Sequence, residues 1–218
     1  MSTVLPVKRL LYALPSDAPS RFVRLVLGEL GLPYSLTPPT GETLQDIPTL
    51  RDENAFLISY ASCIAEYLDE AYGPCFLGRE TITRAQSRQV WRYVDGPLNA
   101  RVTEPLVYEK VHRRLSGLGT PDSTAIQRAN AAKSYYFGEL AGLIEQNRWI
   151  AGPELTFADL SLAAQISLLD YLDQIDWVAF PIVADYYRRL KSRPAMRHLL
   201  HDRLEGINPS STYADLDF

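Results

Sequence analysis

The spacing of hydrophobic positions along the chain changes near residue 80. Before that point, short apolar runs at 9–13 (RLLYA), 32–36 (LPYSL) and 56–58 (FLI) are bounded by turn residues and predict strands. Longer amphipathic segments between them give the order strand, helix, strand, hairpin, helix. Beyond residue 80 the spacing is helical throughout, which predicts a small α/β unit followed by an all-helical one. The predicted helices cover 83–115, 123–147, 156–173 and 180–201.

The helix predicted over 156–173 is the element around which the other helices are expected to pack. Thr156 and Asp159 are spaced as in a capping box, in which each side chain binds a backbone N–H of the first turn. Leu155 and Leu160 stand where a hydrophobic staple would fix the entry angle. Because the residues that follow are apolar on nearly all sides, we expect this helix in the middle of a domain.

Composition and charge exclude several classes of protein. The 218 residues are 46% hydrophobic and carry a net charge of −4, so the chain can bury a core and has no general attraction for nucleic acid. No apolar run approaches the roughly 20 residues of a membrane span, and the start, MSTVLPVKRLLYAL, lacks the features of a secretory signal. Cys63 and Cys75 are too few for a disulfide framework, and His112, His198 and His201 lack metal-ligand spacing. We expect a cytoplasmic protein without a metal.

Four motifs carry a resemblance to a known family. They are Leu11-Tyr12…Pro15…Ser20-Arg21-Phe22-Val23-Arg24-Leu25, Ile47-Pro48-Thr49-Leu50, Ile64-Ala65-Glu66-Tyr67-Leu68-Asp69-Glu70 and Trp149…Ala151-Gly152…Thr156-Phe157-Ala158-Asp159. In this order they resemble the glutathione transferase superfamily over nearly the whole chain. The resemblance implies a thioredoxin-like α/β domain over 1–78, an all-α domain over 79–204 and a C-terminal tail over 205–218. The fold alone licenses no activity.

The catalytic position of that family is altered here. In active relatives a Ser, Cys or Tyr near the end of the first strand stabilises the glutathione thiolate, which is the competent nucleophile. The resemblance places Asp17 at the position used by the serine-type enzymes. An ionised carboxylate repels a thiolate. Ser16 could substitute if the loop shifted. Ser20 is the other weak candidate for a catalytic hydroxyl, and it is expected to do no more than cap the following helix.

The positions that would bind the rest of glutathione are altered too. Relatives hold its γ-glutamyl end with a Glu-Ser or Asp-Ser pair, and this chain has Tyr60 and Ala61 there. The ligand's charged groups would then be buried without partners, which is costly. Pro48 stands at the family's cis-proline, and the gap over 37–46 is too short for the helix usual in relatives. We therefore expect no cofactor and no catalysis, the alternative being an active glutathione-dependent transferase or isomerase that uses Ser16.

The last 14 residues, 205–218, include apolar side chains that alternate with acidic ones. Tyr213, Leu216 and Phe218 are interleaved with Asp215 and Asp217, a spacing suited to docking in a basic-rimmed groove. We interpret this tail as an extended partner-recognition peptide. Deleting residues 213–218 is then expected to leave the thermal midpoint nearly unchanged.

The ending, the shortened linker, Asp17 and the run Lys191-Ser192-Arg193-Pro194 together resemble one branch of the superfamily. That branch is the transferase-like cell-division proteins of alphaproteobacteria, which bind the tubulin-like FtsZ. The resemblance implies a homodimeric, non-enzymatic adaptor on FtsZ polymers at the division site. It also implies that the C-terminal tail signals to the septal wall-synthesis machinery.

A basic stripe adds a further candidate surface. Arg84, Arg88 and Arg92 recur at i, i+4 and i+8 and so share one helix face. The stripe could be solvated, face a second copy, or bind an acidic partner such as FtsZ. A stress-related or ribosome-associated regulator remains a third reading of the whole chain.

Overall fold

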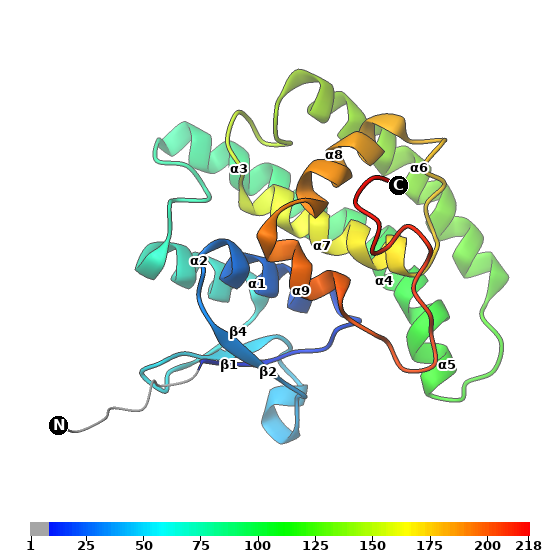
Figure 1. Ribbon diagram of the computed structural model, residues 1–218, viewed down its shortest axis with the longest axis horizontal. Helices are drawn as coiled ribbons and strands as arrows, with labels where there is room; N and C mark the ends of the chain where they lie inside the picture. The colour runs from blue at the N-terminus through cyan, green and yellow to red at the C-terminus, as the bar shows by residue number, and fades with distance from the viewer. Residues whose placement is uncertain (1–8) are drawn as a thin grey trace.

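A four-stranded mixed sheet forms the N-terminal part of the molecule (Figure 1). The computed structural model describes residues 9–218. The strands are β1 (Arg9–Tyr12), β2 (Tyr34–Thr37), β3 (Thr49–Arg51) and β4 (Leu57–Ser59). β1 lies parallel to β2 and antiparallel to β3, and β4 pairs with β3 at the sheet edge. This confirms the predicted order of strands. The first eight residues, which carry part of the argument against a secretory signal, lie outside the described residues.

Two helices complete this unit. α1 (Ala18–Glu29) buries most of its residues, and α2 (Ala61–Tyr72) follows β4 directly. α1 ends as the sequence predicts, with Gly31 in the left-handed region at φ +64°. The Leu32 N–H then donates to the Leu27 carbonyl at 2.9 Å, the hydrogen bond that closes a helix end of this kind.

The connection between β2 and β3 is short, as expected from its Pro, Gly and Thr content. Within it lies one brief 3-10 helix, η1 (Gly41–Leu44), and no α-helix. The connection ends at a cis peptide bond between Ile47 and Pro48, the position where the resemblance implies one.

The helical domain begins with one continuous helical run from residue 81 to 115, which confirms the predicted segment. Two stretches of it are π-helical, and the first contains Pro97, whose missing N–H cannot join an α-helical ladder. No helix within residues 9–218 is long and apolar enough to cross a bilayer. The run consists of α3 (Thr81–Tyr93), η2 (Val94–Thr103), α4 (Glu104–Val107), η3 (Tyr108–His112) and α5 (Arg113–Leu115).

The prediction of a single helix over 180–201 is wrong. α8 (Pro181–Lys191) is followed by a break, a 3-10 turn η4 (Pro194–Met196) and the short α9 (Arg197–Leu200). The break falls at Arg193, whose backbone is extended at φ −69° and ψ 141°. The ring of the following Pro194 clashes with a helical backbone at the residue before it, so Arg193 cannot continue the helix.

α7 (Phe157–Tyr171) lies in the middle of the fold, as predicted (Figure 1), and α6 (Ser123–Gln146) packs against α8. Every residue of α7 is buried, and the helix contacts α1, α3 and α8. The capping box is present: Asp159 accepts a hydrogen bond from the Thr156 N–H at 2.7 Å. The other carboxylate oxygen of Asp159 accepts from the Tyr186 hydroxyl at 2.6 Å, so the helix start is also tied to α8.

Candidate functional site

The loop after β1 is shaped by Asp17, the residue at the family's catalytic position. Asp17 is the N-cap of α1, and one of its oxygens accepts from both the Ser20 N–H at 2.7 Å and the Ser20 hydroxyl at 2.5 Å. The expectation that Ser20 caps the helix is therefore wrong, since Asp17 provides the cap three residues earlier. Pro19 at the start of the helix, where an N–H is not needed, is the sequence signal that could have placed the cap correctly.

Asp17 and Ser16 line one cavity of about 350 Å³ between the first loop and the helical run. Burial raises the pKa of Asp17, and hydrogen bonds from Ser20 lower it by a smaller amount. The hydroxyl of Ser20 is engaged by Asp17, whereas Ser16 lies on the cavity wall. The helical run contributes the opposite wall, with Asn99, Thr103, Glu104, Val107, Tyr108 and His112.

Tyr60 and Ala61 stand at the start of α2, where the γ-glutamyl pair is expected. Tyr60 precedes the helix with a positive φ of 68° and gives it no side-chain cap. Its side chain is 60% exposed, and its hydroxyl donates to Asp46 at 3.2 Å. The positions therefore hold a phenol and a methyl group in place of a carboxylate and a hydroxyl.

The sheet register gathers these altered positions at one end. Tyr12 pairs with Thr49, and Thr49 pairs with Ser59. Pro48 immediately precedes β3, Tyr60 immediately follows β4, and the Asp17 loop follows β1. Residues 9–218 contain no group of three or more His, Cys, Asp or Glu side chains placed to hold a metal ion.

The basic stripe is only partly free. Arg88 makes two hydrogen bonds to the Glu66 carboxylate of α2, at 3.1 and 3.2 Å, and so joins the two domains. Arg92 is 73% exposed and lies 3.9 Å from Asp95. Arg84 is exposed and lines a small surface hollow to which Glu66 also contributes. Arg84 and Arg92 are thus the members of the stripe that face solvent.

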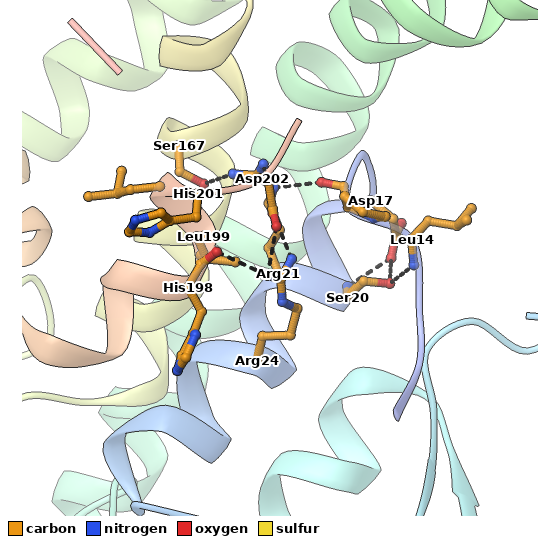
Figure 2. A network of polar contacts seen from close by, with 12 residues as sticks. Leu14, Asp17, Ser20, Arg21, Arg24, Ser167, His198, Leu199, His201 and Asp202 are labelled. Atoms are coloured by element: carbon orange, nitrogen blue, oxygen red, sulfur yellow. Dashed lines mark hydrogen bonds and ion pairs between the residues drawn. The ribbon is translucent and has the colours of Figure 1, made fainter. Parts of the chain in front are cut away.

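A buried polar network that the sequence does not indicate joins α1 to the end of the chain. Arg21 and Arg24 of α1 both contact the Asp202 carboxylate, at 3.2 and 2.7 Å (Figure 2). Arg21 is wholly buried and also donates to the Ser167 hydroxyl of α7 at 2.8 Å. Its Nη1 further donates to the Tyr213 hydroxyl at 3.1 Å. Because these partners are far apart in the sequence, no short-range sequence pattern indicates that they pair.

The C-terminal segment folds back beside α7 and ends near α8 (Figure 1), so it is not an extended free tail. Tyr213 is wholly buried, and its hydroxyl donates to the Leu199 carbonyl. Phe218 packs on the core. The prediction that Tyr213 is available to a partner is therefore wrong for this arrangement, whereas Asp215, Leu216 and Asp217 are exposed.

The order of the two domains, and the way the altered positions gather beside the first helix, define a protein of the glutathione transferase class. The family described as the glutathione S-transferase C-terminal domain matches residues 124–203. The chain is 33% identical to FtsZ-localized protein A of Caulobacter vibrioides, with 97% of this chain and 99% of that protein covered.

Two solved structures are similar over nearly their whole length. A glutathione S-transferase from Rhodospirillum rubrum F11 has a TM-score of 0.93 and 34% identity, covering 96% of this chain and 100% of that one. FzlA from C. crescentus has a TM-score of 0.91 and 31% identity, covering 97% and 100%. The chain belongs to the glutathione S-transferase-like family that includes FtsZ-localized protein A. The resemblance seen in the sequence is confirmed.

Proposed function

We propose that this protein is a non-catalytic adaptor that binds FtsZ filaments at the division site and regulates septal constriction. The observation that carries the proposal is the likeness, over 97% of the chain, to a protein named for its localisation with FtsZ. The altered site supports the non-catalytic part. Asp17 replaces a thiolate-stabilising group, and Tyr60 and Ala61 offer a charged tripeptide no carboxylate.

The proposal includes a homodimer. Ile82 at the start of α3, Leu57 on β4 and Tyr72 at the end of α2 are 74%, 55% and 43% exposed. A contiguous apolar patch marks a site of association with another molecule, and we propose that these side chains contribute to one. Sedimentation velocity across a concentration series measures this directly, and a monomer at all concentrations counts against it.

The exposed residues of the C-terminal segment are the proposed contact with the septal wall-synthesis machinery. Asp215, Leu216 and Asp217 face solvent together and offer two carboxylates around one aliphatic side chain. Replacing both aspartates with Ala is expected to leave FtsZ binding intact and to slow constriction in cells. Loss of FtsZ binding in this variant would instead assign the segment to the filament.

Co-sedimentation with FtsZ tests the central claim. The protein is expected to pellet with FtsZ assembled by GTP and to stay in the supernatant without nucleotide. The variant Arg84→Glu/Arg92→Glu is expected to pellet less if the stripe binds the acidic filament surface. Arg101→Glu/Arg114→Glu, at two other exposed arginines of the same helical run, is the matched control because it changes the net charge by the same amount. No pelleting above background with assembled FtsZ contradicts the proposal.

A glutathione-dependent enzyme is the second candidate. It is favoured by the similarity to a protein named a glutathione S-transferase and by the place of Ser16 on the cavity wall. Calorimetric titration with glutathione separates the two functions. If the protein binds glutathione saturably and Ser16→Ala abolishes that binding, the result supports the enzyme. If titration with glutathione gives no heat of binding, the result supports the adaptor.

A further inference from the structure

The side chain of Phe218 sits in a cage of aromatic and basic residues. The ring lies 4.5 Å from the Trp177 ring and 5.9 Å from the Tyr187 ring, measured between centroids. Trp177 and Tyr187 stack on each other at 5.4 Å with an interplanar angle of 7°. Arg188 and Lys191 approach the Phe218 ring at 4.9 and 4.2 Å. We call Trp177, Tyr187, Arg188 and Lys191 the aromatic cage.

The cage contacts the main chain of Phe218 as well as its ring. Arg188 donates to the main-chain oxygen of Phe218 through Nε at 2.7 Å and also through Nη2. The same guanidinium thus faces the aromatic ring and donates to the main-chain oxygen of the same residue. Two contacts of different chemistry select an aromatic residue and fix its orientation.

Lys191 is held in place by groups other than Phe218. Its Nζ lies 3.2 Å from the Asp170 carboxylate of α7 and donates to the Thr212 carbonyl at 2.5 Å. Both Lys191 and Asp170 are buried. Burial lowers the pKa of Lys191, and the Asp170 and Asp215 carboxylates act to raise it. One cation of the cage is therefore preorganised, and it favours an acidic residue shortly before the bound aromatic ring.

The segment between Tyr213 and Phe218 is anchored at both ends and exposed in the middle. The Tyr213 side chain is wholly buried in the protein interior, and the Phe218 ring occupies the aromatic cage. Leu216, between them, is 45% exposed, and Asp215 and Asp217 face solvent. The carboxylates complement the basic cage, and the seated ring fixes the exposed residues in one arrangement.

We propose that the aromatic cage is a binding site for the aromatic residue of a short acidic peptide, and that Phe218 is its resident ligand in cis. Seating Phe218 holds residues 214–217 against the body and displays their side chains as a fixed surface. The inference rests on contacts within the chain and is independent of FtsZ.

Hydrogen exchange on the full chain tests the seating in cis. Phe218→Ala is expected to accelerate exchange of the amides of residues 214–217 at least tenfold while amides of α7 keep their protection. Leu216→Ala, which removes an exposed side chain from the same segment, is the matched control and is expected to leave exchange unchanged. Unchanged exchange in Phe218→Ala overturns the proposal. Faster exchange throughout α7 also overturns it, because Phe218 would then be an ordinary core residue.

A peptide added in trans tests recognition itself. A chain ending at Ala214 keeps Tyr213 and leaves the cage open, and the probe is the amidated peptide Ala-Asp-Leu-Asp-Phe, residues 214–218. We expect saturable binding by calorimetry, and binding at least tenfold weaker for the peptide with Phe218→Ala and for the chain with Arg188→Gln. Equal binding of the two peptides, or none, overturns recognition. If the shortened chain does not fold, the exchange experiment decides alone. Neither readout contains FtsZ, so failure here leaves co-sedimentation as a separate test.

Discussion

Arg21 and Tyr213, 192 positions apart in the chain, share a hydrogen bond of 3.1 Å in the protein interior. The Arg21 guanidinium also lies 5.8 Å from the Tyr213 ring. The bond joins the first helix of the thioredoxin-like domain to the C-terminal segment. It makes that segment a structural part of the body.

Truncating Tyr213 is expected to destabilise the fold. Tyr213→Ala removes a wholly buried aromatic ring and should lower the free energy of unfolding by about 3 to 5 kcal/mol. Tyr213→Phe should lower it by about 1 to 3 kcal/mol, because Arg21 and the Leu199 carbonyl each lose a hydrogen-bond partner. Urea denaturation measures both. Leu216→Ala, in the same segment and 45% exposed, should stay within about 0.5 kcal/mol. A Tyr213→Ala variant as stable as this control would mean that the segment does not pack on the body.

Asp17 is expected to matter as a helix cap more than as a chemical group. Asp17→Ala should cost about 1 kcal/mol of stability, and Asp17→Ser should be close to neutral because serine also caps. Restoring this hydroxyl alone should not restore glutathione binding, since Tyr60 and Ala61 still lack the γ-glutamyl partners. Calorimetry on Asp17→Ser, with Asp17→Ser/Tyr60→Glu/Ala61→Ser as the comparison, checks this. Tight binding by the single variant would show that Tyr60 and Ala61 are not the obstacle.

Asp52 is expected to make the N-terminal domain sensitive to acid. Burial raises the pKa of Asp52, but hydrogen bonds from Tyr67 at 2.5 Å and Tyr72 at 2.9 Å, with the charge of Arg9, outweigh it and hold this pKa below its ordinary value of 3.8. The folded-state pKa is depressed, so this stabilisation is present above pH 3.8 and is lost as the pH falls through the folded value.

Tyr67→Phe is the variant that tests this assignment. It removes one donor to Asp52, so the folded-state pKa should move up toward the ordinary value and the loss of stability below pH 3.8 should become shallower. Carboxyl chemical shifts followed by NMR report the pKa directly. An Asp52 pKa that is the same in both proteins would assign its lowering to the backbone N–H of Glu53, to Tyr72 and to Arg9.

The ion pair of Arg88 with Glu66 is expected to contribute little to stability. The two side chains are 39% and 37% exposed, so solvent screens their attraction. A double-mutant cycle with Arg88→Ala and Glu66→Ala should give a coupling energy of about 0.2 to 1 kcal/mol. A coupling well above that range would indicate that the pair fixes the orientation of the two domains.

Local pattern was sufficient for most of the fold. The capping box of Thr156 and Asp159 and the glycine at residue 31 each act within a few residues, so their consequences could be predicted from spacing. The failures were also local in appearance. Asp17 caps α1 in place of Ser20, and Pro194 breaks the helix expected over 180–201 at the residue before it.

The sequence by itself determined the class of fold, the order of its elements, and the replacement of the residues that a glutathione site requires. Those properties depend on which side chain stands at which position. Only the tertiary structure decided the fate of the last residues, because Tyr213 and Phe218 are bound by Arg21 and by the cage around Trp177, which lie far from them in the chain. Interleaved aromatic and acidic residues have the same pattern whether they extend into solvent or fold back. The contacts that choose between the two form only when distant segments pack together.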